Sequence, residues 1–369
     1  MTLLTEATST RDTFIRRLLI VIAFGGLVGL VWWLRDLLLL VFGAVLVAVI
    51  FRSLADPLHR RFGLSHAVSL ALAIAIMAVI AVIVVVFFGG EILAQARTLQ
   101  DTLPVAWADL QQRLSATDLG QRVLDWVKGF APTDDGVLSG AGQIVSALGS
   151  SLADLILVLM GGVYLASQPV LYRDGLLMLL PKGARKLTGE ALADSGRALR
   201  QWLGGQVISM GSVGVMATLG LWALDVPAAL ALGVIAAIFD FVPIVGPLVA
   251  AIPALLLGLT VSPMTAVYVG VLYLVAQQIE GNVISPLVQQ RKVDLPPALL
   301  LFALVGIGTM FGIEGIVLAA PLTVVIYVMV KLLYVREALN TPTSVPGEVT
   351  EPAGHARRSR RETEGLGPD

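Results

Sequence analysis

Long apolar runs without charged residues dominate this sequence. Ala67–Phe88 contains no charged side chain, and as an α-helix it would reach roughly 33 Å, about the thickness of the hydrocarbon core of a bilayer. The residues AVILMFWYC make up 57% of the 369-residue chain and charged residues only 14%, against about a quarter charged in ordinary globular proteins. A soluble fold of this size cannot hide so much apolar surface. The sequence therefore predicts an all-α, polytopic helical integral membrane protein.

The same composition argues against several functions. The net charge is −1 and the basic residues form no patch, so nucleic acid is not a predicted partner. The chain has no Cys, and its three histidines (His59, His66 and His355) stand in polar segments. We find no pairing of nucleophile and base and no set of metal ligands inside an apolar run. The prediction is a protein that is not an enzyme and carries no cofactor and no metal.

Five apolar runs are predicted as membrane spans, and a longer apolar region follows them. Arg16-Arg17 precedes the first run as in a signal peptide, but no small-residue cleavage site follows, which favours a retained anchor. Gln168-Pro169 interrupts the fourth run. Pro and Gly repeatedly interrupt the region from Pro227 to Tyr334. The five runs are Leu18–Leu34, Leu37–Phe51, Ala67–Phe88, Leu152–Leu180 and Val207–Leu224.

The charges between the runs predict the orientation. Loops rich in Lys and Arg tend to stay in the cytoplasm. Basic residues precede the first run, and others stand in the second connection and in Tyr172–Gln201, whereas Glu91–Ser150 has four basic residues against seven acidic ones. Strict alternation of the spans then places both termini in the cytoplasm and Glu91–Ser150 outside.

Five regions follow from these patterns: 1–90 with three spans, 91–150 as an extracytoplasmic helical segment, 151–206 with the fourth span and a cytoplasmic interfacial helix, 207–335 as a core with broken hairpins, and 336–369 as a disordered tail. Glu91–Phe130 shows one apolar helical stripe interrupted at Pro104. It predicts either an external hairpin that packs subunits or covers a pathway, or a helix resting on the headgroups. Gly183–Leu203 is amphipathic and favours an interfacial helix on anionic lipid.

Three acids stand in a stretch without any basic residue. Gln201–Gln290 contains no Lys or Arg but has Asp225, Asp240 and Glu280. Asp225 precedes an expected loop. Glu280 lies about 15 Å along a helix from the next basic residues, near the middle of the bilayer. A carboxylate there costs several kcal/mol unless it is protonated, paired or hydrated, and it usually marks an ion or substrate pathway. The alternative is a structural carboxyl group that joins helices through hydrogen bonds.

Asp240 also introduces a break in the helical pattern. Pro243, Gly246 and Pro247 cannot continue a helix, and the flanking runs Ala228–Phe241 and Leu248–Leu259 are too short to cross a bilayer. Such backbone survives in lipid only when protein buries it or when it lines a wet cavity. The pattern predicts a re-entrant hairpin, and two tilted spans with a tight external turn remain the alternative.

A second interrupted region follows the helix that carries Glu280. Ala298–Phe311 and Gly315–Val330 are separated by a break that contains Glu314. Two short, broken apolar pairs are the best indication of a transport site that a sequence offers. The predicted pathway residues are Asp240, Glu280, Gln277, Asn282 and Glu314, and the predicted helix-breaking residues are Pro243, Gly246, Pro247 and Pro286.

At these residues the chain resembles the autoinducer-2 exporter family of bacterial inner-membrane proteins. The resemblance rests on FVPIVGPLVAAIPA (Phe241–Ala254), QQIEGNVISPLVQ (Gln277–Gln289) and GIVLAAPL (Gly315–Leu322). It covers about Phe14 to Tyr334, although the segment before Pro296 lacks a His often found there in the family. The resemblance implies a homo-oligomeric, even pentameric, secondary transporter in the bacterial inner (plasma) membrane. Some members are linked to export of a small furanone and others to sodium(lithium)/proton antiport, so the resemblance leaves the substrate open.

Three functions therefore stand at this point. The first is a cation-coupled secondary transporter of a small solute or cation, with a proton or sodium ion as partner at Asp240 and Glu280. The second is a passive, channel-like exporter of a small neutral solute, in which the acids only hydrate a pore. The third is a membrane scaffold that moves nothing.

Overall fold

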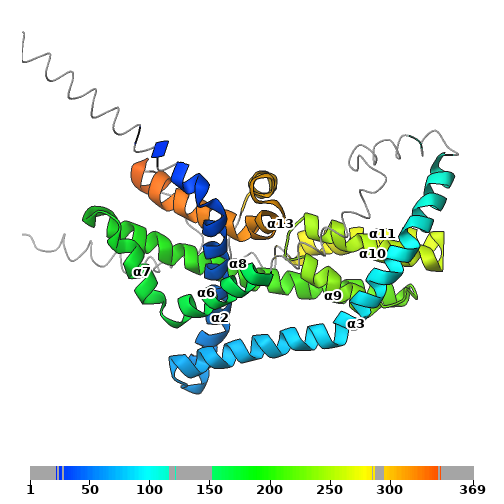
Figure 1. Cartoon of the computed structure of the whole chain (residues 1–369), viewed down its shortest axis with the longest axis horizontal. Coiled ribbons are helices and arrows are strands. Elements are labelled where there is room, and N and C mark those ends of the chain that lie inside the picture. The colour runs from blue at the N-terminus through cyan, green and yellow to red at the C-terminus, as the bar shows by residue number, and fades with distance from the viewer. Residues whose placement is uncertain are drawn as a thin grey trace, which may run out of the picture.

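The computed structural model describes residue 22 and residues 25–26, 29–115, 121, 152–284, 286, 295–339 and 341, with side chains described for all of these except residues 88, 91–114, 152 and 338. Every regular element in these ranges is a helix (Figure 1). Five helices are long and apolar enough to cross a bilayer, or six if a bent pair counts as one span. The predicted all-helical, polytopic membrane protein is confirmed. About half of the predicted first span and most of the predicted tail lie outside the described residues.

Helices α2 (Arg35–Phe62) and α3 (His66–Ser115) are joined by a tight turn. Gly63 ends α2 with a left-handed backbone (φ 64°), and its N–H donates to His59 O at 3.0 Å. Glycine adopts this conformation without the penalty that a Cβ brings. The predicted spans Leu37–Phe51 and Ala67–Phe88 lie in these two helices.

Helix α3 continues through Pro104 to Ser115, so the predicted interruption at Pro104 is wrong. A proline removes one backbone hydrogen bond and bends a helix without having to end it.

The fourth run is broken where the sequence predicts. Helix α6 (Leu152–Ser167) and helix α7 (Pro169–Met178) meet at an angle of 91° around Gln168. Proline suits the first turn of a new helix and ends the previous one. Helix α6 packs closely on α2, since a Cβ on Gly162 would lie 2.4 Å from a methyl carbon of Val47.

Helix α8 (Lys182–Ala223) is continuous. The predicted interfacial helix Gly183–Leu203 and nearly all of the predicted span Val207–Leu224 are therefore two parts of one element. Composition changes from charged to apolar near Gly204-Gly205, but no proline interrupts the backbone there. A helix entering lipid keeps its hydrogen bonds, so a change in composition does not require a break.

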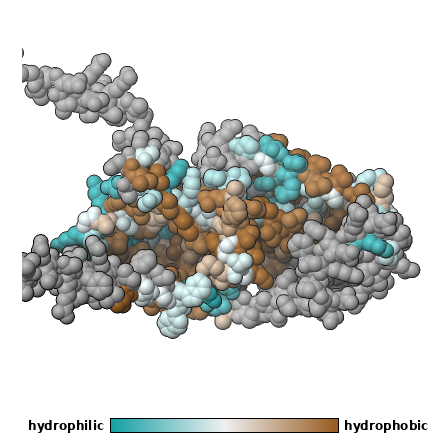
Figure 2. Space-filling view, turned by 90° about the horizontal axis from the view of Figure 1, so that it is seen from above, coloured by the Kyte–Doolittle hydropathy of each residue, from teal (hydrophilic) through white to brown (hydrophobic). Residues whose placement is uncertain are grey.

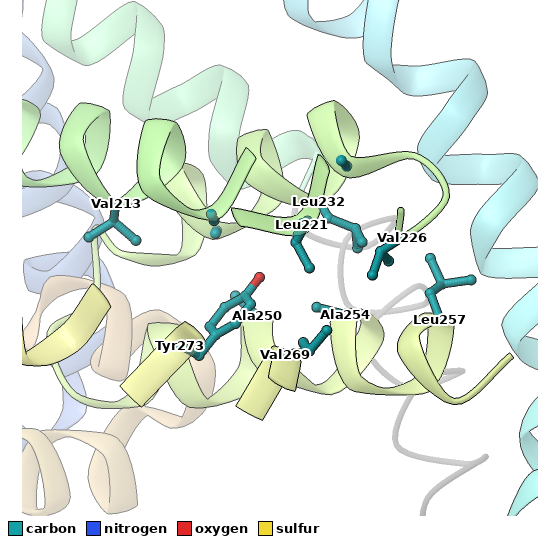
Figure 3. Close-up of a cluster of buried hydrophobic side chains, with 12 residues drawn as sticks. Val213, Leu221, Val226, Leu232, Ala250, Ala254, Leu257, Val269 and Tyr273 are labelled. Atoms are coloured by element: carbon teal, nitrogen blue, oxygen red, sulfur yellow. The ribbon is translucent and has the colours of Figure 1, made fainter. Parts of the chain in front are cut away.

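Helices α9 (Ala229–Phe239), α10 (Val245–Val261) and α11 (Pro263–Ile279) pack with α8 around one hydrophobic cluster. Figure 3 shows side chains of α8 and α9 meeting side chains of α10 and α11. The Tyr273 hydroxyl of α11 points toward α8 and α9. A short π-helix, η1 (Glu280–Ile284), continues α11. The cluster includes Val213, Leu221, Leu232, Ala254, Val269 and Tyr273.

Helix α13 (Pro297–Met329) contains a reversal, and the π-helix η2 (Val330–Ala338) follows it. Gly312 has φ 64° and ψ −142°, which no helix contains. A Cβ on Gly308 would lie 2.7 Å from Ile316, eight residues on, whereas eight residues of straight helix span about 12 Å. The chain therefore folds back on itself at Gly312.

Large apolar side chains remain exposed on the outer helices, as a lipid-facing surface requires. Val86 and Phe87 of α3 are 69% and 70% exposed. Hydrophobic residues cover the centre of the face seen in Figure 2.

Candidate functional site

The turn between α9 and α10 places Asp240 at its start. Ile244 has a left-handed φ of 72°, and Gly246 N–H donates to Val242 O at 2.9 Å. A Cβ on Gly246 would lie 1.7 Å from Phe239 O, so only glycine fits there. Pro247 is the third residue of α10, where its missing N–H leaves no hydrogen bond unmade. The residues predicted to break the helix therefore form the reversal that separates the two short helices.

Helix α8 holds this turn through three side chains on one face. The Trp202 and Phe241 rings meet edge to face at 5.9 Å. Gln206 Nε2 donates to the backbone oxygen of Asp240 at 2.6 Å, which satisfies one of the carbonyl groups left free at the end of α9. Ser209 follows one turn later on the same face.

The Asp240 side chain is buried beside Ser209 and Glu280. Only 3% of Asp240 is exposed. Its carboxyl group lies within hydrogen-bonding reach of the Ser209 hydroxyl, and the charge of Glu280 acts on it. Asp240 Oδ2 is enclosed and has no hydrogen-bond partner.

Glu280 reaches the same hydroxyl from another helix. Ser209 Oγ donates to Glu280 Oε1 at 2.6 Å. Glu280 is half-buried and is the first residue of η1. Pro286, soon after η1, has no N–H to offer the carbonyl of Asn282, and the wider π-turn is a common response to such a defect. The structure thus brings Asp240 and Glu280, forty residues apart in sequence, to one serine.

No described basic side chain forms an ion pair with either acid. The described ion pairs of α8 lie nearer its start: Arg197 pairs with Asp194, and Arg200 Nη1 contacts Asp56 Oδ2 at 2.7 Å. Arg200 is nine residues before Ser209, about 13 Å along the helix. The two carboxyl groups therefore face each other across one hydroxyl, and no basic side chain in the described part of the chain pairs with them.

The other predicted pathway residues are placed differently. Gln277 is half-buried on α11, one turn before Glu280. Asn282 is exposed and its amide donates to Gln278 O and Oε1 at 3.0 and 2.8 Å. Glu314 is exposed beside the reversal at Gly312. Neither Asn282 nor Glu314 has a described contact with Asp240 or Glu280.

Ser209 and Gln206 were not predicted from the sequence. Both stand on α8, three residues apart, among apolar and small residues. That spacing puts two polar groups on one helical face. It is the feature of the sequence from which a polar contact of α8 could have been predicted. Serine is common in membrane helices, where it often bonds its own backbone, so only the packed structure distinguishes Ser209 from Ser212, which donates to Ile208 O.

The fold and the group formed by Asp240, Ser209 and Glu280 define a multi-pass helical membrane protein with one buried and one half-buried acid between interrupted helices. Residues 18–334 match the family described as AI-2E family transporter. The chain belongs to the AI-2E transporter family, and the predicted resemblance is confirmed.

Several individual proteins, provisionally named as transport proteins, are similar to the chain. YrrI of Bacillus subtilis (strain 168) is 30% identical over 202 residues, covering 54% of this chain and 56% of YrrI. YueF of the same organism is 31% identical over 158 residues, covering 43% and 42% of the two chains. A Thermotoga maritima protein is 28% identical over 192 residues, covering 52% and 59%. The chain thus spans about half the length of the curated relatives it matches.

Proposed function

We propose that this protein is a cation-coupled secondary transporter of a small solute or cation, working by alternating access. The pair formed by Asp240 and Glu280 binds the coupling cation, a proton or a sodium ion. One observation carries the proposal: two acids share one buried hydroxyl, and no described basic residue compensates them. Acids in such surroundings usually serve ion pathways, since each carries a large desolvation cost.

The interrupted helices support the same function. Helix α9 has 11 residues and α10 has 17, which correspond to about 16 and 26 Å, both short of a ~30 Å core. We propose that α9 with α10, and the two halves of α13, are re-entrant hairpins. Free helix ends at mid-membrane supply ligands and allow one part of a transporter to move against another.

The proposed orientation places both termini in the cytoplasm of the cell and residues 91–150 outside the plasma membrane. The 91° bend supports it: if α6 crosses the bilayer, α7 lies along the surface. Exposed Leu171 and Leu176 suit contact with lipid tails, and Lys182 and Arg185 follow within one or two turns. We also propose, from family membership, that the protein assembles as a homo-oligomer, with a pentamer as the first arrangement to test.

Proteoliposomes test the coupling directly. A trapped pH dye reports proton movement under an imposed sodium gradient, and radioactive sodium uptake is followed under an imposed pH gradient. We expect Asp240→Asn and Glu280→Gln to reduce both fluxes at least tenfold. Asp225→Asn is the matched control, because Asp225 is an exposed acid of the same stretch and its left-handed backbone suits Asn. Fluxes equal in all four proteins would contradict the coupling role, and flux that ignores both gradients would favour a passive exporter.

A further inference from the structure

The Ser209 hydroxyl stands between two carboxyl groups as both donor and acceptor. It donates to Glu280 Oε1 at 2.6 Å, and its lone pairs remain available to Asp240, which lies within reach. A hydroxyl has one hydrogen and cannot donate to both acids at once. A hydrogen bond from Asp240 to Ser209 would require that the Asp240 carboxyl group carry a proton.

The enclosed oxygen of Asp240 agrees with that protonated form. Oδ2 is buried without any partner. An isolated ionised carboxylate in an apolar interior is far more costly than an unpaired neutral carbonyl oxygen. If one oxygen of Asp240 carries the proton and donates to Ser209, Oδ2 is only a carbonyl oxygen, and its isolation becomes tolerable.

We propose that Ser209 relays a proton between Asp240 and Glu280, so that the pair holds one proton in common. This rests on the proposed function and names the proton as the ion at the site. In the transfer, the Asp240 O–H bond breaks as its proton moves to Ser209 Oγ. The Ser209 O–H bond breaks at the same time as its hydrogen moves to Glu280 Oε1. The serine is regenerated, Glu280 becomes neutral and Asp240 becomes negative.

The described groups around the pair supply no opposite charge to the acid that is negative at either stage of this exchange. Helices α9 and α10 carry no charged side chain. Among the described residues of α11, Tyr273 is the buried titratable group, and its hydroxyl has no hydrogen-bond partner. The nearest basic groups of α8 contact other acids: Arg197 contacts Asp194 of α8, and Arg200 contacts Asp56 of α2. When Asp240 and Glu280 hold one proton in common, the total charge of the two carboxyl groups is −1 instead of −2.

Infrared spectra of the reconstituted protein test the relay without any transported solute. Difference spectra recorded across a pH titration, in water and in deuterated water, report the C=O stretch of protonated carboxyl groups. We expect an Asp240 band that disappears in Asp240→Asn and shifts in Glu280→Gln. Ser209→Ala should shift the Asp240 band, because the O–H of the protonated Asp240 carboxyl group loses its acceptor. In the Ser209→Ala background, Glu280→Gln should no longer shift the Asp240 band. Ser209→Thr keeps the hydroxyl and should restore both features.

Ser212→Ala is the matched control on α8, because its hydroxyl donates only to its own helix at Ile208 O. A positioned proton-transfer group typically contributes about 10²–10⁴-fold to a rate, so Ser209→Ala should slow proton flux at least ~10-fold and Ser212→Ala should not. If Ser209→Ala does not fold, Ser209→Cys, with its weak S–H donor, should give the shifted band. An Asp240 band that is absent at every pH, or unchanged in Ser209→Ala or Ser209→Cys, would overturn the relay. A band that responds to Ser209 while transport ignores both acids would support the relay and reject the proposed function.

Discussion

Replacing Gly246 by alanine is the most direct perturbation of the turn that carries Asp240. The added methyl group would lie 1.7 Å from Phe239 O, and ordinary contacts begin at 3.4 Å, so the turn must open by roughly 1.7 Å. The opposing atoms belong to the backbone, which cannot turn aside as a flexible side chain can. The hydrogen bond from Gly246 N to Val242 O, 2.9 Å long, would then be lost.

These losses set the magnitude. Overpacking costs about 1–3 kcal/mol, and a broken buried hydrogen bond adds about 1 kcal/mol. We therefore expect Gly246→Ala to reduce the free energy of unfolding by about 2–4 kcal/mol. At roughly 1.3 °C per kcal/mol for a chain of 369 residues, the midpoint of thermal unfolding in detergent should fall by about 3–5 °C at a fixed scan rate. The proton flux carried by the folded fraction should also fall, because the opened turn moves Asp240 from Ser209.

Gly211→Ala is the control, since a Cβ on Gly211 of α8 meets nothing within 4 Å. Alanine favours a helix over glycine by up to about 1 kcal/mol, so its midpoint should stay the same or rise slightly. Equal midpoints for Gly246→Ala and Gly211→Ala would refute the reasoning that this turn requires glycine.

Three other changes test other parts of the fold. Gly312→Ala forces alanine into a backbone region that glycine alone adopts easily, which should lower the free energy of unfolding by about 1–3 kcal/mol. Its unfolding midpoint should lie below that of the control Gly306→Ala, because a Cβ on Gly306 meets nothing within 4 Å. Leu171→Cys would carry the only cysteine of the chain, so a nitroxide label attached there reports on α7 alone. We expect the label to lie about 5–10 Å below the headgroups and to be relaxed by oxygen. Relaxation by a water-soluble nickel complex instead would place α7 in water. Asp56→Asn weakens a partly exposed pairing with Arg200. Chemical unfolding should show a change of less than about 1 kcal/mol in the free energy of unfolding. A decrease of more than about 3 kcal/mol would show that the pair behaves as a buried one.

Local chemistry made the interruptions of the helices predictable. The break at Gln168-Pro169 and the turn around Gly246 both follow from proline and glycine, whose effects act within a few residues. Pro104 has the same chemistry but leaves α3 continuous. The difference lies in what surrounds each residue. Prolines cluster with glycine around Gly246, whereas Pro104 stands alone in a long helical pattern, where one lost hydrogen bond is tolerated.

The composition of the candidate site was only half predictable. Asp240 and Glu280 can be recognised singly, because a lone acid in an apolar stretch is costly wherever it stands. Their proximity could not be read from the sequence, since it depends on how α9 and α11 pack on α8. Ser209 was missed for the same reason: a serine in a membrane helix has no cost that marks it, and its role depends on which face packs against the turn.

Both acids stand where regular helical hydrogen bonding is interrupted, and this connects binding to movement. Asp240 ends α9 at a turn that Gln206 helps to hold through the Asp240 backbone oxygen. Glu280 begins a π-turn whose hydrogen bonds differ from those of α11. Backbone at such points has fewer hydrogen bonds to lose when it rearranges than the middle of an intact helix. A proton that changes the charge of either acid therefore acts on the segments of the chain that can move at the lowest cost. An acid in the middle of α10 would change its charge without that effect. In a transporter driven by a cation, this placement lets the occupancy of the site bias the position of the hairpin.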